Sequence, residues 1–378
     1  MGQLSRNDIL EPVQYLSAHV WHASFGSRHL FRHILPKSSL IHKVLPAVLA
    51  ALAKNLTAPS AHAEILNRLL GITGLVLVVL IILVIGWTVA HKKQDSEELN
   101  TTKSISIETV RADAFSMNYS KFGQGEKTLV ILPGLSVQSV MGSADAVADA
   151  YQILTEEFTV YLFDRRKELP ATYSIHEMAK DTAEAMNVLG LENVCLFGTS
   201  QGGMMAMDLA INHPELVQKL VLGSTAACVT EENLETVDEW ISLAKAGNAA
   251  ELYLSFGEAV YPKEVFEQYR ELLTDAAKTV TPDELNRFII LAEGMKDFNV
   301  ADDLSKIPCP VLAIGSSDDQ VLGAYATAQI AEHLKDRQDF EMYMYDGYGH
   351  AAYDTAPDYK QRLLRFFAPE SVRAAEQR

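Results

Sequence analysis

The sequence predicts an α/β fold, in which a mostly parallel, doubly wound sheet carries an inserted helical cap and is preceded by a transmembrane helix. Three observations lead to this prediction. After residue 107, short and wholly apolar runs alternate with helical patterns, which is typical of strands buried on both faces of a parallel sheet. Consecutive helical patterns interrupt this alternation at 228–305, and a long uncharged stretch lies near the N-terminus.

The uncharged stretch runs from Leu69 to Ala90 and is 22 residues long. As a helix it would extend about 33 Å, enough to cross a hydrocarbon core of about 30 Å. Trp87 lies near the C-terminal end of this stretch, and Lys92 and Lys93 follow that end, as interfacial residues do. We therefore predict a single-pass anchor in the bilayer. Basic residues flank both ends, so the sequence leaves its orientation open.

The segments on either side of this span differ from it and from each other in composition. Residues 1–68 are basic, with histidines at irregular spacing that suits no metal site, and we expect them to skim the membrane or to be poorly ordered. Residues 91–107 are polar and predict a linker. The net charge of the chain is −17, and this acidic excess lies beyond residue 93. It argues against nucleic acid as a partner.

The α/β core is predicted at 108–227 and 306–378. Its expected strands are apolar runs that end in glycine or polar turns, and they lie at 127–134, 159–164, 193–198, 219–224, 309–319 and 340–350. The cap is predicted at 228–305. The three cysteines are far apart, which argues against a disulfide framework or a zinc site; they are Cys195, Cys228 and Cys309.

Ser200 lies in Gly198-Thr199-Ser200-Gln201-Gly202, which fits G-x-S-x-G between a predicted strand and a predicted helix. In such a turn the serine backbone is strained and its hydroxyl is exposed at the end of the sheet. The glycines are required because a Cβ at either flank would collide with the neighbouring strand or helix. This context predicts that Ser200 is a nucleophile.

A serine nucleophile requires a base and a carboxylate that orients it. His350 follows a strand in a glycine-containing loop and is the predicted base, whereas His176, His213 and His333 lie in helical patterns or at a helix end. Two carboxylates follow the preceding strand. We predict Asp318 as the orienting carboxylate, with Asp319 in reserve, because the order Ser, Asp, His matches that of known hydrolases.

The oxyanion formed in such a reaction needs hydrogen-bond donors. One predicted donor is the backbone N–H of Gln201, directly after the nucleophile. The other is the backbone N–H of Leu135, in the turn after the first predicted strand.

Together these segments resemble the α/β-hydrolase fold family, specifically the cap-bearing group with esterases, lactonases and C–C bond hydrolases. The resemblance covers residues 108–368 and rests on "LPGLS", "FDRR", "GTSQGG", "GSSDD" and "GYGH" in the order of the family. It implies a Ser200, Asp318 and His350 triad and no metal or organic cofactor. The chain departs from the family pattern at Pro133-Gly134, where His-Gly is usual, and at "KELP", where Gly-x-Gly is usual.

The predicted function is that of a membrane-anchored serine hydrolase that cleaves an ester, thioester or similar acyl bond in a small molecule, lipid-like compounds included. Four cap aromatics are candidates for the acyl pocket, although they could equally form the cap core: Trp240, Tyr253, Phe256 and Tyr261. A proline-iminopeptidase-like peptidase and a cofactor-free haloperoxidase could use the same triad. A non-enzymatic scaffold is disfavoured, since no triad position is replaced.

Overall fold

The computed structural model describes residues 104–371. The predicted membrane span at 69–90, the segment before it and most of the linker lie outside these residues. Within the described part of the chain, no helix has the length and apolar character needed to cross a bilayer.

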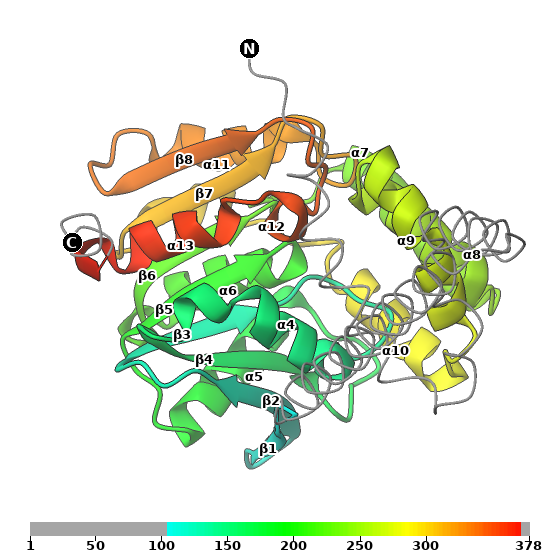
Figure 1. The fold of residues 1–378 in the computed structure, drawn as a ribbon, viewed down its shortest axis with the longest axis horizontal. Helices are drawn as coiled ribbons and strands as arrows, with labels where there is room; N and C mark the ends of the chain where they lie inside the picture. Colours follow the sequence, from blue (N-terminus) through cyan, green and yellow to red (C-terminus); the bar gives the residue numbers. More distant parts are fainter. Residues whose placement is uncertain (1–103, 372–378) are drawn as a thin grey trace, which may run out of the picture. The chain divides into compact units, whose positions relative to one another are not determined.

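An eight-stranded sheet forms the centre of the described chain, with helices against both of its faces (Figure 1). This arrangement confirms the predicted parallel α/β fold. In chain order the strands are β1 (Ile107–Arg111), β2 (Ser116–Phe122), β3 (Lys127–Leu132), β4 (Phe158–Arg166), β5 (Val194–Thr199), β6 (Val217–Gly223), β7 (Val311–Ser316) and β8 (Phe340–Tyr345).

The strands are arranged in the order β1-β2-β4-β3-β5-β6-β7-β8. Strand β2 is antiparallel to β1 and β4, and all other neighbours are parallel. The edge pair β1–β2 was not among the predicted strands. In β2, exposed or half-buried residues interrupt the buried ones, so it lacks the continuous apolar run of the parallel strands. Because β3 to β8 are parallel, their carboxyl ends meet at one edge, where α/β proteins place their sites.

Side chains along each central strand alternate between two cores. In β3, Val130 and Leu132 join one core, while Leu129 and Ile131 join the other, as the two-residue period of a strand requires. Helices α5 (Ile175–Val188), α6 (Gln201–Asn212) and α11 (Ala324–Leu334) contribute to the first core, and α4 (Ala144–Ala150) and α13 (Tyr359–Phe367) pack against the second (Figure 1). Shorter helical segments are Val140–Ser143, Gln152–Leu154, Pro214–Leu216, Ala301–Lys306 and α12 (Ala352–Thr355).

Four helices between β6 and β7 form the cap, at the positions where the sequence predicted helices. They are α7 (Glu231–Lys245), α8 (Ala249–Val260), α9 (Lys263–Ala277) and α10 (Pro282–Glu293). The chain enters and leaves the cap along one short stem, because segments 227–229 and 298–300 exchange backbone hydrogen bonds of 2.8 and 3.0 Å. The cap therefore connects to the sheet at the same edge as the carboxyl ends of β6 and the strands beside it.

Candidate active site

Ser200 is the single residue between β5 and α6, and its backbone angles are φ 51° and ψ −122°. Such angles are costly for any residue with a Cβ and occur mainly where the surroundings enforce them. Here the Ser200 N–H donates to the Gly223 carbonyl at 2.9 Å, and the Thr225 hydroxyl donates to the Ser200 carbonyl at 2.7 Å. The end of β6 thus holds the strained turn in place.

The two glycines of the motif are required by the packing of the turn. A Cβ on Gly198 would lie 2.3 Å from the Gly202 carbonyl oxygen, and one on Gly202 would lie 2.0 Å from the Leu132 carbonyl oxygen. Neither contact is possible without moving the backbone. The strand–turn–helix arrangement expected around Ser200 is therefore present, for the steric reason that the sequence indicated.

His350 follows β8 and is buried, and its Nδ1 lies 2.8 Å from Oδ2 of Asp319. The other carboxylate oxygen of Asp319 accepts backbone N–H groups of Val321 and Leu322 at 2.8 and 3.0 Å. Burial disfavours the charged form of this carboxylate, but His350 and the two N–H donors outweigh burial, so the pKa of Asp319 lies below its usual 3.8. An ionised Asp319 is suited to holding an imidazole by Nδ1.

The prediction that Asp318 orients His350 was therefore wrong, and the reserve residue Asp319 takes that position. Asp318 instead accepts hydrogen bonds from the backbone N–H groups of Gly347 and Gly349, both at 3.1 Å, and from the Ser316 hydroxyl at 2.6 Å. It ties the loop after β7 to the loop that carries His350. The turn after β7 directs the second of these adjacent carboxylates inward, toward His350, and leaves the first one bonded to the glycine loop.

Three strand ends bring these groups to one edge of the sheet. Ser200 follows β5, Asp319 follows β7 and His350 follows β8, and the neighbouring strands β5, β6, β7 and β8 are all parallel. Backbone bonds continue past the ends of the strands, from Ser224 to the Ile314 carbonyl at 2.8 Å and from Ser317 to the Tyr345 carbonyl at 2.9 Å. Residues 150 positions apart in sequence thus lie at the same edge of the sheet.

The turn after β3 lies against Ser200. A Cβ on Gly134 would lie 3.1 Å from the Cβ of Ser200 and 3.7 Å from its hydroxyl oxygen. Leu135 follows in this turn, and Gln201 begins α6 on the other side of Ser200. Both backbone N–H groups predicted as oxyanion donors therefore belong to segments that adjoin the serine. At Gln201 the N-terminal end of α6 adds a favourable field for negative charge.

Comparison with known proteins agrees with this architecture. Residues 127–261 match the family model described as alpha/beta hydrolase fold. The crystal structure of MGS-M2, an alpha/beta hydrolase enzyme from a deep-sea metagenome library, has a TM-score of 0.62 and 21% identity, over 69% of this chain and 97% of that one. The chain is a hydrolase with the α/β-hydrolase fold. The expectation of an enzyme is confirmed, against the non-enzymatic scaffold.

Other proteins that are similar to this hydrolase carry names for particular reactions. RutD from Agrobacterium fabrum, named as a candidate carbamate hydrolase, is 24% identical over 63% of this chain and 94% of its own length. The enol-lactonase from Burkholderia xenovorans has a TM-score of 0.60 and 16% identity, covering 69% of this chain and 99% of that chain.

A buried arginine, not predicted from the sequence, connects both sides of the site in this hydrolase. Nη2 of Arg165, at the carboxyl end of β4, donates to the Pro133 carbonyl at 2.8 Å and to the side-chain oxygen of Gln201 at 2.9 Å. Burial lowers the pKa of Arg165 to about 10, although the adjacent Asp164 partly offsets this. In the sequence the "FDRR" segment contributes to the family resemblance, but its pattern does not indicate the partners of Arg165.

The four aromatic candidates divide between the cap interior and the border with the core. The rings of Trp240 and Phe256 pack in a tilted arrangement inside the cap, with centroids 4.6 Å apart, which fits the alternative that they form its core. The Tyr253 hydroxyl donates to the Gln138 side chain at 2.9 Å, beyond the oxyanion turn. Tyr261 lies beside α12, with its hydroxyl 3.4 Å from the Asp354 carboxylate.

The other histidines of the described chain have different surroundings. His176 on α5 is largely exposed and lies 3.2 Å from Asp208 of α6, and His213 lies 3.7 Å from Glu215. His333 belongs to the last turn of α11. Among residues 104–371 there is no group of His, Cys, Asp and Glu side chains that could hold a metal ion.

Proposed function

We propose that the chain is a serine hydrolase that cleaves an ester, thioester or similar acyl bond. Ser200 is the nucleophile, His350 is the base and Asp319 orients the imidazole. The observation that carries the proposal is the buried His350–Asp319 pair at 2.8 Å, at the sheet edge where the strained Ser200 turn lies.

The pair explains how a serine could react at neutral pH. A hydroxyl is a weak nucleophile until a neighbouring base accepts its proton. With Nδ1–H donating to Asp319, the Nε2 atom of His350 is left unprotonated, and it can take the proton of the Ser200 hydroxyl. Asp319 then stabilises the imidazolium by remaining ionised.

The reaction proceeds through two tetrahedral intermediates. Ser200 attacks the carbonyl carbon, and the backbone N–H groups of Gln201 and Leu135 stabilise the oxyanion. His350 returns its proton to the leaving group, which departs and leaves an acyl-enzyme. Water, deprotonated by His350, then releases the acid and restores Ser200.

The substrate class is supported by the reactions named for the relatives. Carbamates and enol lactones both offer a carbonyl carbon to a nucleophile, which is the common requirement of this mechanism. Tyr253 and Tyr261, at the border between cap and core, are the better candidates for contact with the acyl group. Membrane anchoring by residues 69–90 and a lipid-like substrate stay predictions.

An activity-based fluorophosphonate probe tests the proposal directly. Wild-type protein should become labelled on Ser200, as located by peptide mass spectrometry, and Ser200→Ala should not be labelled. Ser224→Ala is a matched control, because Ser224 is also a buried serine with positive φ at a strand end, and its labelling should equal that of the wild type. Equal labelling of Ser200→Ala would refute the assignment.

A panel of substrates separates the acyl hydrolase from the peptidase alternative. We expect p-nitrophenyl esters to be hydrolysed and an aminoacyl amide to be left intact, with chain lengths from acetyl to palmitoyl to measure the acyl preference. Faster cleavage of the amide than of every ester would favour the iminopeptidase-like reaction.

A further inference from the structure

The two proposed oxyanion donors belong to separate segments of the chain. Leu135 lies in the turn after β3, whereas Gln201 begins α6. Donors of this kind are effective only when they are held within a few tenths of an ångström of the oxyanion position. Some contact must therefore set the spacing between the two segments.

Arg165 makes such a contact on both sides at once. A single nitrogen, Nη2, lies 2.8 Å from the Pro133 carbonyl oxygen and 2.9 Å from the Gln201 side-chain oxygen. Pro133 is two residues before Leu135, and Gln201 carries the other donor. The arginine is 3% exposed, so water does not compete for these bonds.

Gln201 is also held from the opposite direction. Its side-chain Nε2 donates at 2.8 Å to the Leu291 carbonyl, in the last turn of α10, where helix carbonyls lack partners of their own. Both ends of the amide are thus occupied, and the residue cannot rotate without losing a buried hydrogen bond.

We propose that Arg165 is a positioning residue for the oxyanion hole. It acts through Pro133 and Gln201 and need not touch the substrate. This inference rests on the proposed function. Burying the Arg165 guanidinium costs free energy, and a positioning role explains why a charged side chain is kept there.

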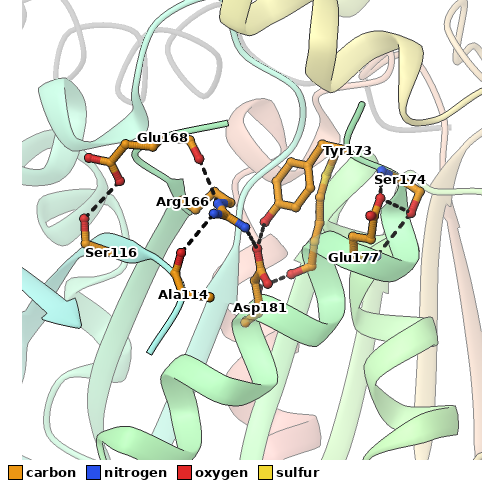
Figure 2. A network of polar contacts seen from close by, with 10 residues as sticks. Ala114, Ser116, Arg166, Glu168, Tyr173, Ser174, Glu177 and Asp181 are labelled. Atoms are coloured by element: carbon orange, nitrogen blue, oxygen red, sulfur yellow. Dashed lines mark hydrogen bonds and ion pairs between the residues drawn. The ribbon is translucent and has the colours of Figure 1, made fainter. Parts of the chain in front are cut away.

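The neighbouring Arg166 offers a matched control. Figure 2 shows its guanidinium directed toward α5 and the β1–β2 turn, where it pairs with Asp181 at 3.3 Å and donates to the Ala114 and Glu168 carbonyls at 3.2 and 2.8 Å. Tyr173 donates to the same Asp181 at 2.7 Å. Arg166 therefore fastens the same strand end to the scaffold without contacting the oxyanion segments.

The test compares Arg165→Met, Arg165→Lys and Arg166→Met in the full chain. The measurements are kcat and KM for p-nitrophenyl acetate, the second-order rate of fluorophosphonate labelling, and the melting temperature. For Arg165→Met we expect kcat and the labelling rate to fall about 10- to 100-fold, somewhat less than loss of a donor itself, with KM changed less than about threefold. Arg165→Lys should be intermediate, because an ammonium lacks the planar fork. Arg166→Met should lower the melting temperature while kcat stays within about twofold.

Gln201→Met provides a second test if Arg165→Met fails to fold. It keeps the backbone N–H but removes both side-chain contacts of Gln201, the acceptor of Arg165 and the donor to the Leu291 carbonyl. Because both contacts hold the donor segment, the same selective loss of kcat is expected. Full kcat in folded Arg165→Met or in Gln201→Met would overturn the inference while the proposed function stands. A wild-type protein that is not labelled at Ser200 would overturn the proposed function, and this inference with it.

Discussion

Adjacent carboxylates at the end of β7 have separate roles, and at the residue scale this gives the sharpest prediction. Asp319→Asn should lower kcat about 10⁴-fold, because an amide in that position favours the wrong imidazole tautomer. Asp318→Asn should leave kcat within about tenfold but lower the melting temperature, because the amide cannot accept both glycine N–H groups. Ester hydrolysis and thermal unfolding of the two variants measure this. The reverse ranking of kcat would return the orienting role to Asp318.

The strained backbone of Ser200 gives a second prediction. Residues in such conformations cost about 1–3 kcal/mol, and glycine adopts them with little strain. Ser200→Gly and Ser200→Ala should both abolish activity, but the glycine variant should be more stable than the alanine variant by about 1 kcal/mol. Urea unfolding of the two proteins compares their free energies of unfolding. Equal stability would mean that the turn stores no strain.

The residues of the site differ in how far they could be predicted. Ser200 lies in a motif whose glycines are explained by steric contact alone, and His350 was the one histidine in a loop after a strand. The choice between Asp318 and Asp319 depends on which way one turn directs a side chain, and spacing does not encode that. Arg165 could not be predicted either, because its partners are a carbonyl and an amide from segments distant in sequence.

At the scale of elements, one ion pair joins the cap to the sheet. Arg287 of α10 lies 2.5 Å from Asp164 of β4, and both side chains are mostly buried. Arg287→Met should destabilise the protein by about 2–3 kcal/mol, because it leaves a buried carboxylate without its cation. Lys245→Met is the control. Lys245 and its partner Glu293 are 58% and 39% exposed, so water screens this pair and the loss should be at most about 0.5 kcal/mol. Urea unfolding that gave equal losses would contradict this ranking.

The helix that follows His350 contains a half-buried carboxylate, Asp354, with an inverted pH response. Burial raises the pKa of Asp354 above 3.8, an effect only partly offset by Lys360 and by Tyr261. A raised folded-state pKa means that the stability contributed by this group falls as pH rises from about 3.8 through the raised value. Asp354→Asn should therefore gain stability relative to wild type as pH rises from 4 to 8. Urea unfolding across this range would contradict the prediction if the difference between the two proteins stayed constant.

Elements were predicted to different degrees for a physical reason. The central strands are buried on both faces and the cap helices have one apolar face, so each leaves a clear period in the sequence. Helices α7 and α10 also begin with capping boxes at Thr230 and Thr281. The pair β1–β2 lies at the edge of the sheet with many exposed residues, and its weak pattern was assigned to no strand.

At the scale of the whole molecule, the three cysteines lie at different depths, so different amounts of unfolding are needed to expose each thiol. All are free. Cys195 lies in β5 at the centre of the sheet and Cys309 just before β7, and burial raises the pKa of these thiols to about 12 and about 11. Cys228 is half-buried in the stem of the cap, where its backbone forms an antiparallel β-bridge with that of Asn299. A thiol reacts as its thiolate and only when reagent can reach it.

These placements predict an order of reaction with a thiol reagent at pH 8. Cys228 should react first, because local opening of the cap stem is enough to expose it, whereas Cys195 requires loss of the central sheet and should react at the rate of global unfolding. Peptide mass spectrometry after timed alkylation distinguishes the sites, and unfolding in urea should make all three react at similar rates. Alkylation of Cys195 before Cys228 in the native protein would mean that the sheet opens more readily than the cap, contrary to the stability expected from a core buried on both faces.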